Sequence, residues 1–287
     1  VLPLKQHVGA PCKAIVSEGE YVKRGQLIAV PGGLGANIHA SYSGTITKVT
    51  DTDIHMAADD VQDFTTYVPI PEFQTNLEAI ESAGVVGAGG AGFPTAVKLK
   101  TEIPNGVFIA NAAECEPLLA HNIHQMETQA AQLVRGIKYC MEITKAPKAY
   151  IAIKPKHKKA VVALIKETKD EPNIDVFRLP DMYPAGDERV IVREIMGIVL
   201  EPGQLPGAVG ACIDNVETIK HIAEAIEDRK PAIDKDLTVS GRVEQKESVF
   251  VDVPIGTTAH ELIMKAGGYI KPYGEIVVGG PQTGRAG

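Results

Sequence analysis

The chain has 287 residues, of which 44% are hydrophobic and 23% are charged, and its formal net charge is −7. This composition is typical of a globular protein long enough for two or three domains. The negative charge and the lack of a basic run argue against binding to nucleic acid or to a lipid surface. No apolar run reaches the roughly 18–20 residues that a membrane span needs, and no signal peptide is expected.

The cysteines do not form a metal-binding pattern. Cys12, Cys115, Cys140 and Cys212 lie far apart, and no two of them form C-x-x-C. We therefore predict separate thiols in a reducing cytosol, with neither a zinc site nor iron–sulfur ligands in this part of the protein. Because the chain starts at Val1 and ends on "VVGGPQTGRAG", a strand pattern that runs into a loop, we interpret it as part of a longer protein.

Residues 1–70 are predicted to form an all-β module. Short alternating runs are separated by glycines, which is typical of hairpins. The stretches "EGEYVKRGQLIA" and "IHASYSGTITKV" resemble the hairpins of biotinyl/lipoyl-type barrel-sandwich domains. In carrier domains of that kind a lysine at a hairpin tip bears the cofactor, whereas "GGLGANIHAS" has no lysine. We therefore expect a structural module rather than a carrier.

Residues 71–232 are predicted to form an α/β domain, after the linker-like "VPIPEF". Helical patterns cover 76–84, about 124–143, 157–170, 187–196 and 217–228. Four apolar strands are expected at 107–111, 149–154, 174–180 and 209–214. Strands that alternate with helices predict a central, mostly parallel sheet covered by helices. Ligands bind such sheets at the carboxyl ends of the strands.

Residues 233–287 are predicted to be a small β-grasp domain. Strand patterns at 236–243 and 248–255 are followed by the helical stretch "GTTAHELIMKAGG" and by a closing strand, "EIVVGG". Thr258 and Glu261 have the spacing of a capping box, and Gly267 suits a helix end.

The run "GVVGAGGAGFPTAVKL" (84–99) contains a G-x-G-x-x-G pattern at Gly87, Gly89 and Gly92. A Rossmann turn needs a strand before the first glycine and a helix that contains the third. Here a helical stretch precedes the run, and Pro94 suits the first position of a helix that begins after Gly92. We expect Gly89 and Gly90 to need positive φ and close approach to a ligand, an anion or a flat ring. A purely structural glycine turn is the alternative.

Four motifs in order resemble one family. "GAGGAGFPTAVKL" (87–99) resembles the flavin-binding loop of the NADH-oxidising flavoprotein subunit of respiratory complex I, and more closely that of the RnfC protein of the Rnf electron-transport complex. "NAAECEP" (111–117), "YPAGDER" (183–189) and "DNVET" (214–218) match further segments of that family. The β modules at the two ends also match RnfC, so the resemblance spans nearly the whole chain. It implies a complex I flavoprotein-like FMN domain between a barrel-sandwich hybrid module and a β-grasp domain of the SLBB type.

The resemblance also implies a site that holds FMN with NADH stacked on it. Lys98 would supply positive charge, and Asn215 and Thr218 would meet the phosphate. The cofactor-binding residues that it implies are Gly87, Gly89, Gly90, Gly92, Lys98, Asn111, Glu116, Tyr183, Asp187, Asp214, Asn215 and Thr218.

NADH would be bound by Phe93, Glu116 and Glu188. Phe93 could instead be a core residue, and the two glutamates could be solvated carboxylates at helix starts. No catalytic acid or base is predicted, because hydride transfer between NADH and FMN requires none.

Several residues depart from the family pattern. Ala88 and Ala113 stand where complex I carries Arg and Asp, and "LLAHNIHQ" follows "ECEP" in place of an acidic continuation. These departures favour the RnfC-like electron-transfer protein associated with D-proline reductase. His121 and His124 are spaced i, i+3, but no third ligand accompanies them, so no metal site is predicted.

The resemblance implies an electron-transfer flavoprotein module that takes a hydride from NADH onto FMN. Its electrons would pass to an iron–sulfur acceptor in the Rnf complex or a proline reductase system, and 4Fe-4S clusters are expected only in the longer protein. The expected location is the cytoplasm, which includes the inner face of the cell membrane, without insertion into it. The alternative is a non-redox ligand-binding or scaffold subunit. NADH versus NADPH, the acceptor and the oligomeric state stay open.

Overall fold

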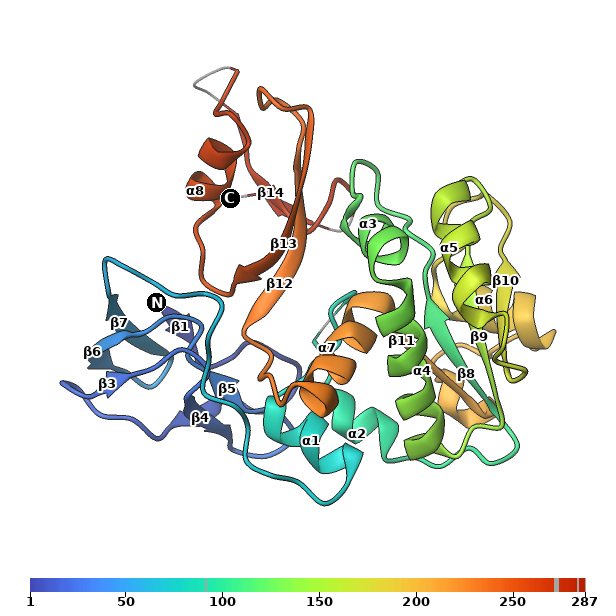
Figure 1. Ribbon diagram of the computed structural model, residues 1–287, viewed down its shortest axis with the longest axis horizontal. Helices are drawn as coiled ribbons and strands as arrows, with labels where there is room; N and C mark the ends of the chain where they lie inside the picture. The colour runs from blue at the N-terminus through green and yellow to red at the C-terminus, as the bar shows by residue number, and fades with distance from the viewer. Residues whose placement is uncertain (91, 271–273, 283, 287) are drawn as a thin grey trace.

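The computed structural model describes residues 1–90, 92–270, 274–282 and 284–286. Its N-terminal module consists of two antiparallel sheets, with strand orders β1-β7-β6-β3 and β2-β4-β5 (Figure 1). Buried Leu4, Val22, Ile28, Ile46 and Ile54 belong to one hydrophobic cluster of this module. The all-β prediction for this part is confirmed. The strands are β1 (Leu2–Pro3), β2 (Cys12–Ala14), β3 (Tyr21–Val22), β4 (Leu27–Pro31), β5 (Ile38–His39), β6 (Gly44–Val49) and β7 (Asp53–Ala58).

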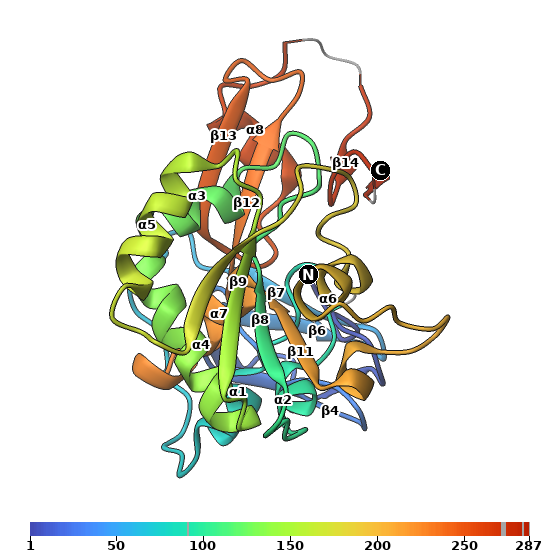
Figure 2. The ribbon, with the colours of Figure 1, turned by 90° about the vertical axis from the view of Figure 1, so that its right-hand side faces the viewer.

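The middle of the chain forms a parallel four-stranded sheet in the order β10-β9-β8-β11. Helices cover both of its faces, with α4, α5 and α7 on one side and α6 on the other (Figure 2). The strands are β8 (Val107–Asn111), β9 (Lys148–Ile153), β10 (Ile174–Arg178) and β11 (Ala211–Asn215). The helices are α1 (Asn76–Ala83), α2 (Thr95–Leu99), α3 (His121–Thr128), α4 (Ala130–Thr144), α5 (Lys158–Thr168), α6 (Glu188–Met196) and α7 (Val216–Glu227), with a 3₁₀ turn at Pro206–Val209. The predicted α/β sheet is therefore confirmed.

The strand order reverses between β8 and β11. From β8 the chain moves outward through β9 to β10 and then returns to form β11 on the other side of β8. Asn111 and Asn215, the last residues of these two strands, are register partners. A parallel sheet binds ligands where its strand order reverses, at the carboxyl ends. The sheet therefore directs attention to the segments that follow β8 and β11.

One long helix was expected from about residue 124 to 143, and this prediction is wrong. The segment forms α3 and α4, which are separated at Gln129, where the backbone has φ −128° and ψ 28°. The hydrophobic periodicity continues through the break, but the two helices have different partners: α3 packs on α5 and β12, and α4 packs on α7. The start of α2 also differs by one position, because Pro94 is its N-cap and not its first helical residue.

The C-terminal region contains an antiparallel pair of strands, β12 (Asp234–Ser240) and β13 (Glu247–Pro254), followed by α8 (Ala259–Lys265). The Thr258 side chain accepts the Glu261 amide as predicted. The expected closing strand behaves differently: β14 (Val277–Val278) pairs with β15 (Arg285–Ala286) and, within the described residues, does not join β12 or β13. The β-grasp assignment therefore stays a prediction.

Polar contacts join the N-terminal module to the C-terminal region. The Arg24 guanidinium donates to both carboxylate oxygens of Asp234, at 2.7 and 2.6 Å, and both side chains are only 3% exposed. The Ser41 hydroxyl donates to the carbonyl of Ile255, and the hydroxyl of Tyr42 lies 2.6 Å from that of Thr257. Since these contacts cross the expected domain borders at 70/71 and 232/233, the borders themselves stay predictions.

Candidate functional site

The glycine-rich run forms a loop between two helices. Gly84 ends α1 with φ 70°, and α2 begins directly after the loop. The loop closes on itself, because the Gly87 amide donates to the Phe93 carbonyl at 2.9 Å and the Thr95 amide donates to the Val85 carbonyl at 3.0 Å. With a helix on each side and no preceding strand, this is not a Rossmann turn, as the sequence indicated.

The tip of the loop lies over the start of α7. The Ala88 amide donates to the hydroxyl of Thr218 at 2.9 Å. A Cβ at Gly89 would lie 3.1 Å from the side chain of Asn215, so the two residues are in close contact. Asn215 caps α7 by accepting the Glu217 amide at 2.8 Å. The loop is thus held at the carboxyl end of β11.

The glycines of the loop serve different purposes. Gly92 has φ 68°, and a Cβ there would lie 3.3 Å from the Gln6 carbonyl of the N-terminal module. The expectation of positive φ at Gly89 and Gly90 is wrong, because neither has it. Both are exposed, and no heavy atom lies within 4 Å of the Cβ that Gly90 lacks. Gly92 is therefore required by the fold, whereas Gly90 leaves space in front of the loop.

A lysine–aspartate pair lies beneath the loop. The Lys98 ammonium donates to Asp214 Oδ1 at 2.9 Å and to the Ile213 carbonyl at 2.7 Å. The Lys98 side chain is 29% exposed and that of Asp214 is 1% exposed. Burial raises the pKa of Asp214, and Lys98 only partly opposes this; the pKa of Lys98 is raised because Asp214 outweighs the effect of burial. Asp214 Oδ2 is buried and has no hydrogen-bond partner among the described residues.

Two of the predicted motifs are joined by hydrogen bonds. Asn111, at the end of β8, donates its side-chain amide to the Gly186 carbonyl at 2.9 Å, and the Gly186 amide donates to Cys115 Sγ at 3.0 Å. A Cβ at Gly186 would lie 2.6 Å from the Ala113 carbonyl oxygen. The motifs "NAAECEP" and "YPAGDER" therefore lie side by side. The sequence alone did not indicate this link, because only a required glycine in the second motif signals it.

The start of α6 forms the other side of the site. Asp187 caps this helix by accepting the Arg189 amide at 2.9 Å. The next residue, Glu188, is exposed, yet the surrounding protein raises its pKa, with Lys98 acting in the opposite direction. Tyr183 is 58% exposed. Beside α6 lies an open cavity of about 300 Å³, within the range of ligand sites. It is lined by Asp187, Glu188, Arg189, Gly203, Gln204, Leu205 and Pro206.

Two residues expected to bind NADH lie in different surroundings. Phe93 is half-buried and is not assigned to a hydrophobic cluster of the described chain, which argues against a core role. Glu116 is also half-buried, and its Oε2 accepts the Gln282 amide of the C-terminal region at 3.0 Å. Their nucleotide-binding roles stay predictions.

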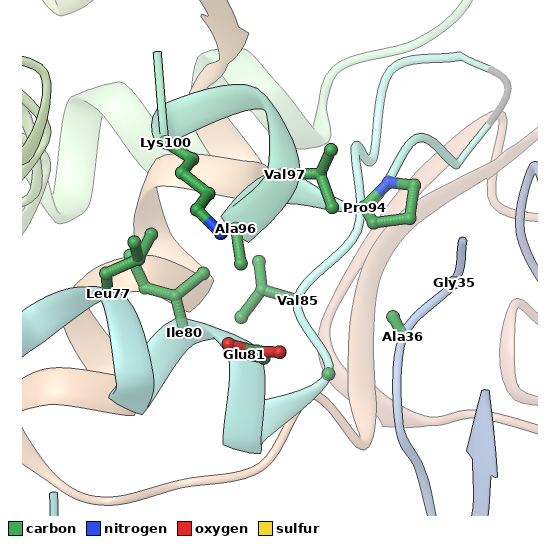
Figure 3. A pocket seen from close by; sticks show the side chains of 11 residues that line it. Gly35, Ala36, Leu77, Ile80, Glu81, Val85, Pro94, Ala96, Val97 and Lys100 are labelled. Carbon is green, nitrogen blue, oxygen red and sulfur yellow. The ribbon is translucent and has the colours of Figure 1, made fainter. Parts of the chain in front are cut away.

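A second cavity, of about 100 Å³, lies between the N-terminal module and helices α1 and α2 (Figure 3). Leu77, Ile80 and Val85 line it, with Glu81 and Lys100 beside them. It is more enclosed than the cavity at α6, but it is smaller than ligand sites usually are. Because Lys98, Asn111 and Asp214 are not among its lining residues, we do not identify it with the site.

In the part of the chain that the structure describes, no three His, Cys, Asp or Glu residues are arranged to hold a metal ion. His121 Nδ1 lies 3.0 Å from the Thr238 hydroxyl, and His124 is exposed. Cys12, Cys140 and Cys212 are buried, and Cys115 is half-buried.

Comparison with known proteins assigns the family. Residues 80–224 match the Nuo51 FMN-binding domain, and residues 1–66 match the RnfC barrel sandwich hybrid domain. The chain is 34% identical to the RnfC protein of the proton-translocating ferredoxin:NAD(+) oxidoreductase complex of Clostridium ljungdahlii, over 99% of this chain and 66% of that protein. The chain belongs to the RnfC family. This confirms the resemblance that the four motifs carried, and the complex I flavoprotein-like fold with it.

The other similar proteins agree with this assignment. The cobalamin reductase PduS of Salmonella typhimurium is 38% identical over 83% of this chain and 48% of its own length. The NAD+-reducing [NiFe]-hydrogenase in its air-oxidised state is 22% identical with a TM-score of 0.61, over 72% of this chain and 41% of the hydrogenase chain, which shows a shared fold. This RnfC-family chain thus spans about half to two thirds of the length of these curated relatives. A specific link to proline reductase stays a prediction.

Proposed function

We propose that this RnfC-family chain is an electron-transfer module that binds FMN where the strand order reverses and takes a hydride from NADH. The observation that carries the proposal is the Lys98–Asp214 pair beneath the exposed Gly89–Gly90 tip, within the segment that matches an FMN-binding domain. The pair places a positive charge at the carboxyl ends of β8 and β11, where such sheets bind nucleotides.

The residues present fit a flavin nucleotide. An ammonium group has three N–H donors, and two of those of Lys98 are used by Ile213 and Asp214, which leaves one directed by the same pair. The open space beside Gly90 admits a planar ring against bare backbone. Asn215 begins α7, whose N-terminal amides and helix dipole favour a phosphate. Thr218 holds the loop through Ala88, so its predicted contact with the phosphate would be additional.

When bound, FMN would supply hydride acceptance and the conversion from two-electron to one-electron transfer. The protein would bind and orient the reactants. Lys98 would offset negative charge on the ring system. Glu188 and Glu116 would accept hydrogen bonds from hydroxyl or amide groups of the nicotinamide nucleotide, and the cavity beside α6 would admit part of it. No side chain is required to move a proton.

The names of the relatives suggest partners. The relative from Clostridium ljungdahlii is part of a ferredoxin:NAD(+) oxidoreductase complex, and PduS is a cobalamin reductase. We infer that the longer protein, with 4Fe-4S clusters outside this part, passes electrons to other Rnf subunits or to a reductase. No helix in the described ranges is long and apolar enough to cross a bilayer. The proposed location is the cytoplasm, with peripheral attachment to a membrane complex in the Rnf case.

The test is flavin retention followed by reduction. The protein is incubated with FMN, freed of unbound flavin and titrated with NADH without oxygen while the visible spectrum is recorded. We expect retained flavin and loss of the flavin band. The Gly90→Val variant should fold, because no atom lies within 4 Å of the new Cβ, but it should not retain FMN. Absence of flavin from the wild-type protein at micromolar concentration would contradict the proposal.

A non-redox scaffold role is the second candidate. It is favoured by the extent to which Asn111, Glu116 and Thr218 already bond within the protein. Retained FMN that NADH does not reduce, with the dinucleotide still bound, would support this role and contradict the redox role.

A further inference from the structure

Strand β12 presents a polar face to the rest of the protein. Asp234, Asp236, Thr238 and Ser240 alternate along it, and side chains two residues apart lie on one face of a strand. Val239 lies on the other face and packs against the small hydrophobic cluster of the C-terminal region. The strand therefore meets its own region with an apolar side chain and the α/β sheet region with polar side chains. In Figure 1 it runs from beside α7 to beside α3.

The first half of β12 is fixed to the flavin side of the site. The Asp236 amide donates to Glu217 Oε1 at 2.7 Å, and the Lys235 ammonium lies 2.9 Å from Glu217 Oε2. Lys235 also donates to the Ala88 carbonyl of the glycine loop at 3.4 Å. Lys220 of α7 donates to both carboxylate oxygens of Asp236, at 2.9 and 3.0 Å. The strand is thus anchored to the helix that begins at Asn215.

The second half of β12 is fixed to the loop that carries Glu116. Thr238 Oγ1 accepts the amides of Ala120 and His121, both at 3.0 Å. The N-cap of α3 is Ala120, whose side chain cannot accept a hydrogen bond, so Thr238 satisfies amides that a capping residue normally would. The Ser240 hydroxyl donates to the carbonyl of Leu118, which is held at φ 65°, a conformation that costs free energy for a residue other than glycine.

The same loop is also contacted further along the C-terminal region, since the Gln282 amide donates to Glu116 Oε2. Residues 116–121 are therefore positioned from outside by side chains and backbone that lie more than a hundred positions later in the sequence. Nothing within the loop replaces the cap that Thr238 provides, because Ala120 makes no side-chain hydrogen bond.

We propose that Thr238 is a positioning residue for the nucleotide site: it caps α3 from the C-terminal region and thereby holds the loop that carries Glu116. The proposal rests on the function inferred above, in which Glu116 binds the dinucleotide. It predicts that the C-terminal region sets the affinity for NADH and leaves the affinity for FMN unchanged, because Thr238 contacts only the loop after β8.

The test compares Thr238→Val with the wild-type protein loaded with FMN. Valine keeps the shape but removes the hydroxyl. The amides of Ala120 and His121 should exchange with deuterium about fivefold faster, and the Kd for NADH should rise about fivefold, the usual effect of losing one helix cap. The Kd for FMN should not change. Thr238→Ser should restore wild-type values. Ser248→Ala is the matched control, because that hydroxyl bonds only to Gln245, away from the loop.

Each remaining outcome overturns the proposal at a different step. Unchanged exchange at Ala120 and His121 in Thr238→Val would show that the cap does not hold α3. Faster exchange with an unchanged Kd for NADH would show that the loop does not set nucleotide affinity. Equal loss of FMN and NADH would make Thr238 a general structural residue. Absence of NADH binding by the wild-type protein would contradict the proposed function itself, and it would be evident before any variant is made.

Discussion

Two buried lysine–carboxylate arrangements lie at opposite ends of α7 and differ in how completely they are bonded. At the site, Lys98 meets Asp214, and one oxygen of that carboxylate lacks a partner within the described chain. We call this the open pair. Further along, Lys220 is 1% exposed and donates to both oxygens of Asp236 and to Asp252 at 2.9 Å.

Lys230 completes the second arrangement, which we call the closed cluster. Its ammonium lies 3.3 Å from Glu224, 3.1 Å from Asp234 and 3.5 Å from Asp252. A buried polar network with every member satisfied makes a structure rigid, whereas an incompletely satisfied one costs free energy unless something else occupies it. The comparison suggests that the closed cluster is structural and that the open pair is kept for a ligand.

Replacing Lys220 should have the largest effect on stability. Lys220→Met removes the positive charge from between Asp236 and Asp252, so two carboxylates lose a buried partner. Loss of one member of such a buried pair costs about 3–5 kcal/mol. Urea denaturation should show this loss, and the protein that remains folded should bind FMN with wild-type affinity.

Lys148→Met is the matched control for that change. Lys148 pairs with Asp175 at 2.8 Å, but the two side chains are 42% and 54% exposed. Exposed pairs contribute about 0–1 kcal/mol, so this variant should be nearly as stable as the wild type. Equal destabilisation by the two variants would remove the distinction on which the closed cluster rests.

Replacing Lys98 should give the opposite result. Lys98→Met removes the charge next to the proposed ring site, and a hydrogen bond from a charged donor contributes about 1.5–3 kcal/mol. The Kd for FMN should rise by roughly 10- to 100-fold, as measured by flavin fluorescence titration. Stability without FMN should fall less than in Lys220→Met, because Lys98 is 29% exposed. A variant that binds FMN normally would place the flavin elsewhere.

The pH dependence of stability should identify Glu224 within the closed cluster. Burial raises the pKa of Glu224 to about 7, with Lys230 opposing. A group with a raised folded-state pKa stabilises the fold below its unfolded pKa, and that contribution is lost as the pH rises through the folded value. Wild-type stability relative to Glu224→Gln should therefore fall between about pH 5 and 7, by at most about 1.4 kcal/mol per pH unit. Parallel pH profiles of the two proteins would contradict this assignment.

The sequence predicted the open pair better than the closed cluster, for a physical reason. Parallel strands bring their carboxyl ends to one edge, so Asn111 and Asp214 could be placed near each other from strand patterns alone. The partners of Asp236 come from α7 and from a different strand, and alternation in "DKDLTVS" indicates a strand without indicating which face is covered. Buried polar faces are therefore difficult to predict from periodicity.

The same limit explains the error at Gln129. The apolar periodicity of residues 121–144 is continuous, and the break follows from the different partners of α3 and α4. The pairing of β14 with β15 also depends on tertiary packing, since the local strand pattern at 275–280 was recognised correctly only as a strand. The cap that Thr238 gives to α3 could not be inferred because more than a hundred residues separate the two.

Glu188→Gln should have the smallest effect and would sharpen the description of the open pair. The carboxylate interacts with Lys98 and Asp214, and the protein around it raises its pKa. Because the residue is exposed, the loss of one hydrogen bond from a nucleotide hydroxyl should cost only about 1 kcal/mol, which is roughly fivefold in the Kd for NADH. In the wild type, NADH binding should weaken as the pH falls through the raised pKa, since protonation removes the charged acceptor, whereas the Gln variant should show no such dependence. Glu194→Gln on the same helix, where Glu194 pairs with Arg193, is the control. Equal weakening of FMN and NADH binding by Glu188→Gln would place this residue against the flavin instead, and no change in either would leave it a solvated carboxylate at the start of α6.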